Sequence, residues 1–287
     1  MASTIDITLV PEHTGTAGAM TWWRLSGVLD YDRLVAEWQA ADLPLCDLPA
    51  PPSDTAALRR ALESYRAPRT LVRSLPSGGF AIVDEDFDGD DGDDSDGVDP
   101  DYNVRFKVWI DIDTMELSFD REMPESELDT IFDAFMRGRR ELHHQDVSAW
   151  IVKRCKSMQS IGLRDTGGIY FVPEQFAPTW SAFADLLARC SASRIYEVPA
   201  LKSERAVEAI MESVIADAAA ELEKLSNALN DTDPSTRGLR SKARKCEALA
   251  DKLKLYEDLL GRKMNDISQR VMETDAQIAD MLLLIED

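Results

Sequence analysis

The C-terminal segment from residue 203 onward carries apolar residues at helical spacing, and this pattern constrains the fold more than any other. Between Val207 and Leu229 they recur every three or four residues, which places them on one stripe of an α-helix. Pro234 interrupts the pattern, because proline cannot continue the helical hydrogen-bond ladder. From 236 to 285 apolar residues then recur every seven residues, a repeat that favours supercoiling against a partner helix. We therefore expect an antiparallel coiled-coil hairpin within 201–287, with helices at about 203–230 and 236–285.

The two expected helices differ in length. At a rise of about 1.5 Å per residue, the first would span roughly 40 Å and the second roughly 75 Å. The stretch 264–287 would then have no partner inside the hairpin, and Gly261 could bend the helix just before it. Because large exposed apolar stripes are unusual in monomers, this stripe should pack on the body of the protein or on another chain. In the second case, a homo-oligomer or a complex with a protein partner would use the residues Met264, Ile267, Val271, Ile278, Met281, Leu282 and Ile285.

The composition is that of a globular chain of 287 residues, which is enough for about two domains. A net charge of −21 argues against a surface that binds nucleic acid everywhere. The first residues lack the basic and apolar pattern of a signal peptide, and no stretch approaches the roughly 20 apolar residues of a membrane span. The four cysteines form no CxxC pair, which indicates reduced thiols. We therefore expect a cytoplasmic protein that has no membrane contact.

Residues 1–123 are predicted to form an α+β domain built on antiparallel hairpins. Alternating apolar residues predict a strand at 104–110, and further alternation or apolar runs predict five others. Asp30 could cap a helix that contains Trp38. The remaining strand candidates are 5–9, 22–25, 71–72, 80–83 and 115–119, and 53–65 is a helix candidate.

An acidic segment, 84–101, interrupts this domain with eleven carboxylates and no Lys or Arg. Such a segment is typical of a solvated loop that repels itself. Calcium binding is an alternative, but an EF-hand loop that started at Asp84 would place Ser95 where a bidentate Glu is needed. A third interpretation is an acidic patch that mimics nucleic acid and acts as a decoy.

Residues 124–200 carry the order of a winged-helix module, namely helix, helix and β-hairpin. The helices are expected from Pro124 and from about 146, and the hairpin surrounds a turn at 165–168. A helix near 178–190 and a strand at 195–198 follow. Winged helices bind either nucleic acid or protein, so this order alone does not decide the function.

Local charge favours a binding surface in this region, because 131–164 holds seven basic and three acidic residues. DNA or RNA phosphates could contact this stretch, and basic residues of 237–254 could extend the surface. The alternative is an ordinary solvated face, or one that docks on the acidic loop. The candidate contact residues are Arg139, Arg140, Lys153, Arg154, Lys156 and Arg164.

We find no pattern that predicts chemistry. No glycine loop has the spacing and lysine of a phosphate-binding motif, and the adjacent His143 and His144 would point about 100° apart on a helix. We therefore expect no catalytic residue, no metal and no cofactor. The leading prediction is a non-enzymatic interaction or assembly protein that uses the C-terminal hairpin. A nucleic-acid-associated accessory factor and an acidic decoy are the alternatives.

The run Gly167-Gly168-Ile169-Tyr170-Phe171-Val172-Pro173, between an α/β N-terminal region and a helical hairpin, resembles uncharacterised proteins of phages and mobile elements. This resemblance covers most of the chain. It implies no activity and no functional residues.

Overall fold

The computed structural model describes residues 15–86, 101–111, 113–164, 168–230 and 235–286. Its antiparallel sheets and long C-terminal helices confirm the predicted α+β class. The chain divides into a discontinuous unit, Met1–Leu25 with Ala149–Asp287, and an inserted unit, Ser26–Ser148. The predicted boundaries at 123/124 and 200/201 differ from these, because strand β1 (Thr16–Arg24) pairs with strands that lie after residue 149. The predicted strand at 5–9 lies outside the described residues.

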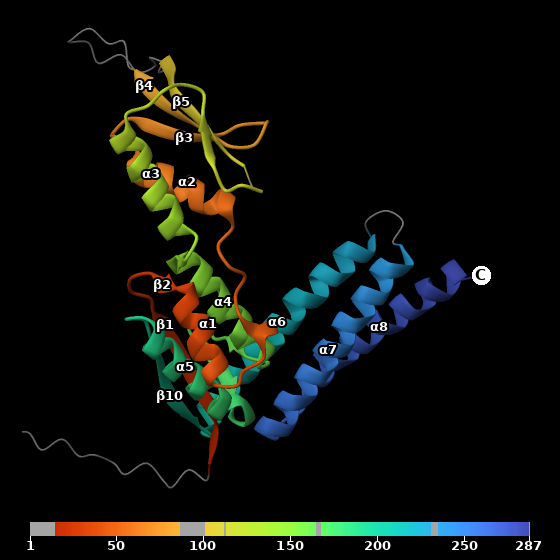
Figure 1. The fold of residues 1–287 in the computed structure, drawn as a ribbon. Coiled ribbons are helices and arrows are strands. Elements are labelled where there is room, and N and C mark those ends of the chain that lie inside the picture. The colour runs from red at the N-terminus through yellow and green to blue at the C-terminus, as the bar shows by residue number, and fades with distance from the viewer. Residues whose placement is uncertain (1–14, 87–100, 112, 165–167, 231–234, 287) are drawn as a thin grey trace, which may run out of the picture. The chain divides into compact units, whose positions relative to one another are not determined.

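The inserted unit is built on an antiparallel sheet with the strand order β3-β4-β5-β6. Helices α2 and α3 cover one face of this sheet (Figure 1). Phe106 and Val108 of β5 both point into the core between sheet and helices, as the alternation predicted. The elements are β2 (Leu29–Asp30), α1 (Tyr31–Ala40), α2 (Asp54–Tyr65), β3 (Thr70–Ser74), β4 (Phe80–Asp86), β5 (Asp101–Ile110), β6 (Leu117–Phe119), α3 (Glu125–Gly138) and β7 (Glu141–Leu142).

Side-chain caps start two helices of this unit where the sequence predicted them. The Asp30 carboxylate accepts a hydrogen bond from the Arg33 backbone N–H at 2.8 Å, which confirms the predicted cap of α1. The Ser53 hydroxyl does the same for the Ala56 N–H at 3.2 Å in α2. Each cap satisfies a donor that the first helical turn would otherwise leave open.

The discontinuous unit holds a second antiparallel sheet, with the order β10-β1-β9-β8. Helix α5 packs on one face, where the buried Trp180 Nε1 donates a hydrogen bond to Thr21 Oγ1 at 3.0 Å. From the other side, Phe171 and Ala200 join a core with residues of the C-terminal helices. The elements are α4 (His144–Ser157, which crosses the unit boundary), β8 (Ile161–Gly162), β9 (Tyr170–Pro173), α5 (Ala177–Cys190) and β10 (Arg194–Leu201).

The predicted winged-helix-like module at 124–200 is not a separate body. Two helices and the β8–β9 hairpin occur in the expected order, but β9 also pairs with β1, with Met20 opposite Phe171. The hairpin is therefore the edge of a larger sheet, and α3 belongs to the inserted unit. A local helix-helix-hairpin order cannot reveal this, because the partner strand comes from the other end of the chain.

Three helices, not two, follow β10. They are α6 (Glu204–Asn230), α7 (Thr236–Leu260) and α8 (Asn265–Glu286), and they lie side by side as a three-helix bundle (Figure 1). The single helix expected at 236–285 is wrong, because Gly261 ends α7 in the left-handed conformation with φ of 66°. A glycine there terminates a helix without the strain that a side chain would bring.

Helix α8 folds back along α7 and α6, and its apolar stripe is covered within the bundle. Met264, Ile267 and Val271 belong to a core with α6 and α7 residues that include Leu222 and Tyr256. Ile278 joins a second core near the loop end, with Leu225, Leu229, Leu239 and Cys246. The predicted heptad positions are therefore apolar contacts, and their partners are helices of the same chain.

The Glu257 side chain makes two contacts that stabilise the α7–α8 junction. Its Oε1 accepts from the Met264 backbone N–H at 2.7 Å, and its Oε2 lies 2.7 Å from Lys263 Nζ. The hydrogen bond to Lys263, together with the Met264 N–H, lowers the pKa of the Glu257 carboxyl.

This junction predicts a pH dependence of folding. A carboxyl whose folded pKa lies below its unfolded value of about 4.3 stabilises the fold above that value. The contribution is lost as pH falls through the lower folded pKa. Glu257→Gln should therefore flatten the rise of the unfolding free energy with pH between the lowered folded pKa and the unfolded value, as measured by urea titration. An unchanged slope would contradict the junction described here.

Candidate nucleic-acid interface

Two strands of the discontinuous unit place aromatic and basic side chains together. In the β1–β10 pairing, Trp22 lies opposite Tyr196 and Arg24 lies opposite Arg194. Because side chains alternate along a strand, residues two apart share a face of the sheet. All four side chains therefore lie on one face, at the end of the sheet where β10 is the edge strand. We call these four residues the aromatic–arginine patch.

The aromatic half of the patch is a stacked pair in contact with solvent. The Trp22 and Tyr196 ring centroids are 5.5 Å apart with an interplanar angle of 16°. Trp22 and Tyr196 are 37% and 39% exposed, so part of each ring is accessible to a ligand. Exposed, roughly parallel rings offer flat apolar surface to a planar ligand.

The basic half is a pair of like charges. Arg24 and Arg194 are both exposed and directly opposite each other, and among the described residues neither guanidinium has an ion pair. Like charges at directly opposite positions destabilise a sheet, by roughly 0.2–1 kcal/mol. A bound anion between the two guanidinium groups would remove this repulsion, so the patch is suited to phosphate or carboxylate.

The sequence predictions missed this patch, although both strands were expected at 22–25 and 195–198. The signal that could have found it is the spacing. Each strand places an arginine and an aromatic residue two positions apart, which puts them on the same face. The pairing of strands so distant in sequence could not be read from either one alone.

Three of the six predicted nucleic-acid contacts are exposed cations in the discontinuous unit: Lys153, Lys156 and Arg164. Lys153 and Lys156 are three residues apart on α4, and thus on neighbouring positions of its surface. Arg164 lines a hollow of about 420 Å³ together with Glu212 and Asp217 of α6. Those acids would repel a phosphate, so Arg164 is the weakest of these three candidate phosphate contacts.

The other three predicted nucleic-acid contacts are not exposed, unneutralised cations of the discontinuous unit. Arg154 is 9% exposed, so it is largely unable to reach a ligand. Arg139 and Arg140 belong to the inserted unit, where the Arg139 Nε lies 2.7 Å from Asp54 and the Arg140 Nε lies 3.8 Å from Asp32. Nearby acids thus already partly neutralise both arginines.

A basic stripe begins α7. Arg237, Arg240 and Arg244 line a hollow of about 620 Å³ on one side of this helix. No acid occurs between Ser235 and Cys246, whereas α6 and α8 are both acidic overall. The first part of the predicted extension, 237–244, is thus an exposed arginine stripe, whereas Lys252 pairs with Asp217 at 2.8 Å and is largely covered. Binding of nucleic acid by this stripe stays a prediction.

The predicted partner contacts of α8 are mostly inside the bundle. Met264, Ile267, Val271 and Ile278 are each at most 3% exposed, so they are unavailable to another chain while α8 stays folded back. Met281 and Leu282 are half-buried against the Ile278 core, and the Ile285 side chain is outside the described residues.

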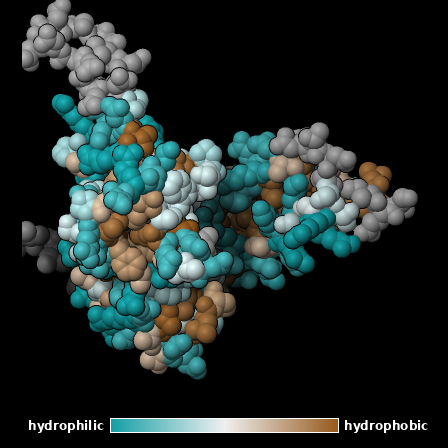
Figure 2. Space-filling model, turned by 45° about the horizontal axis from the view of Figure 1, so that its top comes forward, coloured by the Kyte–Doolittle hydropathy of each residue, from teal (hydrophilic) through white to brown (hydrophobic). Residues whose placement is uncertain are grey.

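What α8 leaves exposed lies elsewhere on its surface. Met272, Leu283 and Leu284 are 68%, 64% and 78% exposed. The visible surface of the bundle is otherwise mostly hydrophilic (Figure 2). Among the described residues, these three are the large apolar side chains that α8 leaves exposed.

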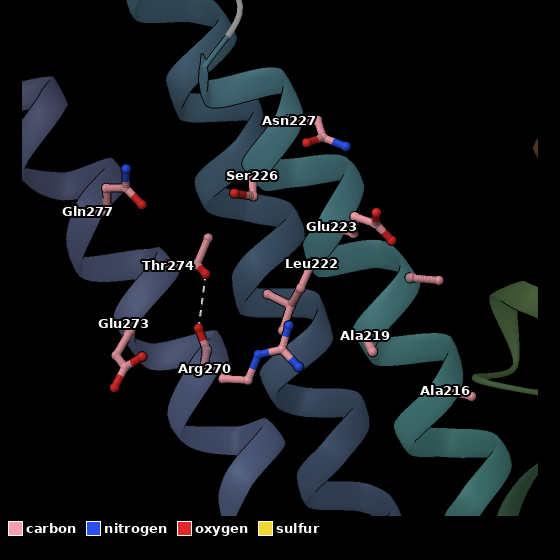
Figure 3. A pocket seen from close by; sticks show the side chains of 11 residues that line it. Ala216, Ala219, Leu222, Glu223, Ser226, Asn227, Arg270, Glu273, Thr274 and Gln277 are labelled. Carbon is pink, nitrogen blue, oxygen red and sulfur yellow. Dashed lines mark hydrogen bonds between the residues drawn. The ribbon is translucent and has the colours of Figure 1, made fainter.

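A hollow of about 680 Å³ runs between α6 and α8 (Figure 3). Small residues of α6 such as Ala216 and Ala219 line one side, and Arg270, Glu273 and Gln277 of α8 line the other. The one dashed contact is internal to α8, where Thr274 Oγ1 donates to the Arg270 carbonyl at 2.9 Å. In Figure 3 the polar groups of this hollow are not drawn bonded to one another across it. A catalytic site differs in this respect, because its polar groups converge on one point.

Metal binding and thiol chemistry depend on where the His, Cys, Asp and Glu side chains lie. The described residues contain no group of three or more His, Cys, Asp or Glu placed to hold a metal ion. Burial raises the pKa of the Cys155 thiol to about 11, which disfavours the reactive thiolate. The calcium-loop alternative falls largely on 87–100, outside the described residues.

The described residues also contain no helix that is long and apolar enough to cross a membrane.

A comparison with protein-family models matches residues 17–287 to a family of unknown function, DUF6744. No curated protein and no solved structure matches the chain. The match agrees with the expected resemblance to uncharacterised proteins, while an origin in phages or mobile elements stays a prediction. Because the match covers nearly the whole chain, this protein belongs to the DUF6744 family.

Proposed function

We propose that this protein is a non-enzymatic accessory factor that binds single-stranded nucleic acid on the aromatic–arginine patch. The observation that carries the proposal is that Arg24 and Arg194 lie opposite each other, without an acidic partner among the described residues. The exposed Trp22–Tyr196 stack lies beside them. Single strands expose base faces that stack on aromatic side chains, and each phosphate is an anion for an arginine. A sheet surface of this kind suits unpaired bases better than a duplex, whose bases are already stacked on one another.

The distribution of charge supports the assignment to the discontinuous unit. The inserted unit holds 29 acidic and 12 basic residues, a net charge of −17. The discontinuous unit holds 24 and 20, a net charge of −4, so most of the acidity lies outside it. Its exposed Lys153 and Lys156 and the α7 arginine stripe are further cations that a polyanion could contact.

The patch yields a direct test by fluorescence anisotropy. The full chain should bind a labelled 20-nucleotide oligo(dT) or oligo(U) at low salt, and Trp22 fluorescence should be quenched on binding. Replacing both arginines, Arg24→Gln with Arg194→Gln, should reduce the slope of log K against log salt by about 0.7 per lost phosphate contact. Trp22→Ala should weaken binding by roughly 5- to 150-fold, since stacking contributes about 1–3 kcal/mol per base.

A matched control comes from the inserted unit. Arg66→Gln with Arg73→Gln removes the same two charges from exposed positions that have no ion pair among the described residues. This control should bind like the wild type. Equal losses of affinity in both double variants would mean that net charge, and not the patch, determines binding. If neither oligonucleotide bound at low salt, the proposal would be refuted.

Docking of a protein partner through the end of α8 is the second candidate. The exposed Leu283 and Leu284 support it, together with the half-buried Met281 and Leu282 beside them. Leu283→Ser with Leu284→Ser should then lower an oligomeric mass measured by light scattering. A monomeric wild type would argue against self-association, one of the two forms of this candidate that the sequence predicted.

A further inference from the structure

The inserted unit has an apolar groove between an edge strand and a helix. A hollow of about 560 Å³ is lined by Met115, Leu117 and Phe119 on one side and by Leu128, Phe132 and Met136 of α3 on the other. Its volume falls within the range typical of ligand sites, about 300–1,000 Å³. Phe132 is 44% exposed, although its neighbours Ile131 and Phe135 are fully buried in the core. The groove is thus an apolar extension of the core that reaches solvent.

One wall of the groove is the open edge of the sheet. β6 is the last strand in the order β3-β4-β5-β6. The Asp111 N–H donates to the Glu116 carbonyl at 2.9 Å, and the Asp120 N–H donates to the Lys107 carbonyl at 3.1 Å. Hydrogen bonding alternates along an antiparallel strand, so Leu117 and Phe119 turn their backbone groups away from β5. They present N–H and C=O groups to whatever lies alongside.

The surroundings of the groove are negatively charged. Glu116 and Asp129 line it, and Asp133 is exposed on the next turn of α3 beside Phe132. Arg139 is the one cation that lines it among the described residues, and the Asp54 carboxylate partly neutralises Arg139 at 2.7 Å. The inserted unit as a whole has a net charge of −17. A ligand that carries positive charge would therefore be favoured.

From these three features we infer that β6 and α3 form a docking site for an extended peptide with alternating apolar and basic residues. The peptide adds a strand to β6 and bonds the outward backbone groups of Leu117 and Phe119. Every second side chain enters the groove and packs on Phe132, and the basic side chains between them lie near the carboxylates. This site is independent of the aromatic–arginine patch, which belongs to the other unit.

The test uses the full chain and a dye-labelled peptide of twelve residues in which valine and lysine alternate. Fluorescence anisotropy should show saturable binding, and amide hydrogen exchange should slow at Leu117 and Phe119. Replacing two inner valines by proline should abolish binding, because proline cannot donate to a strand ladder. Replacing the lysines by glutamate should also abolish it, because the groove and the peptide would then carry like charges.

Two variants of the protein locate the site. Phe132→Ser should weaken binding at least about tenfold, as expected for a central apolar contact. Leu45→Ser removes another exposed apolar side chain of the same unit, one that is 59% exposed and far along the chain, and should leave binding unchanged. Circular dichroism should show that both variants remain folded, since neither side chain is buried.

Several results would overturn the inference. They are the absence of binding at millimolar peptide, equal binding by Phe132→Ser, and equal binding of the proline peptide. If a helix-forming peptide of the same composition bound more tightly, the groove would be a site for a helix and not for an added strand. A concentration-dependent dimer that Phe132→Ser abolishes would mean that a second copy of the chain covers the groove.

Discussion

Ile278→Asp should destabilise the three-helix bundle by about 4 kcal/mol or more, which is among the larger effects of a single substitution. Ile278 is fully buried, and its core neighbours Leu225, Leu229 and Leu239 are apolar, while the Cys246 thiol is only a weak hydrogen-bond donor. An unpaired charge in such surroundings either costs several kcal/mol or must take up a proton. The lost apolar burial adds about 1.5–3 kcal/mol. Urea titration followed by circular dichroism measures the sum.

The matched control lies on the same helix. Met272→Asp introduces the same carboxylate at a position that is 68% exposed, so its effect should stay within about 0.5 kcal/mol. The comparison also tests the fold-back of α8. If α7 and α8 formed one straight helix that projected beyond α6, Ile278 would be exposed and both substitutions would cost equally little. Equal effects would therefore contradict the bundle.

The bundle shows how far a heptad pattern can be read. The spacing identified Met264, Ile267, Val271 and Ile278 as one apolar stripe, and all four are buried. A repeat defines which side chains share a helix face, but it does not say which helix covers that face. The break after α7 has a local signal, a glycine followed within a few residues by Asn265 and Asp266. These residues are typical of one helix end and the next helix start.

The strands were easier to predict than their pairing. The hairpins of the inserted unit join neighbours in sequence, and apolar runs around turns predicted β3 and β4, while alternation predicted β5 and β6. In the discontinuous unit, β1 pairs with β9 and β10 near the middle of the chain. Nothing local to Trp22 or Arg24 specifies these partners, because the pairing depends on contacts with α5 and the C-terminal helices, which bury other residues of the sheet such as Thr21 and Phe171. The aromatic–arginine patch was missed for the same reason.

The basic residues illustrate a further limit of sequence reasoning. A count over 131–164 gave a positive stretch, but it treated all seven cations alike. In the structure Arg139 faces Asp54 and Arg154 is buried, while Lys153 and Lys156 remain exposed. Burial and acids that are distant in sequence decide which cations can reach a ligand, and neither is visible in a local count.

Gly18→Ala should cost about 3 kcal/mol or more and should disturb the strand that carries Trp22 and Arg24. Gly18 has φ of 153° and lies where the β1–β10 register shifts, so a side chain is strained there by the backbone alone. An added Cβ would also lie 2.1 Å from the Val172 carbonyl oxygen of β9. Because this oxygen is backbone in a paired strand, it cannot move aside as the end of a flexible side chain could. Either β1 separates from β9 or both strands shift.

Gly15→Ala separates the two causes of this destabilisation. Gly15 also has a positive φ, 102°, but nothing lies within 4 Å of a Cβ built there. Its substitution should therefore cost only the backbone strain, about 1 kcal/mol. Thermal melting should rank the wild type above Gly15→Ala and Gly15→Ala well above Gly18→Ala. If the two variants melted together, the close approach of β9 to β1 at Gly18 would be wrong, and the sheet that supports the aromatic–arginine patch would need another register.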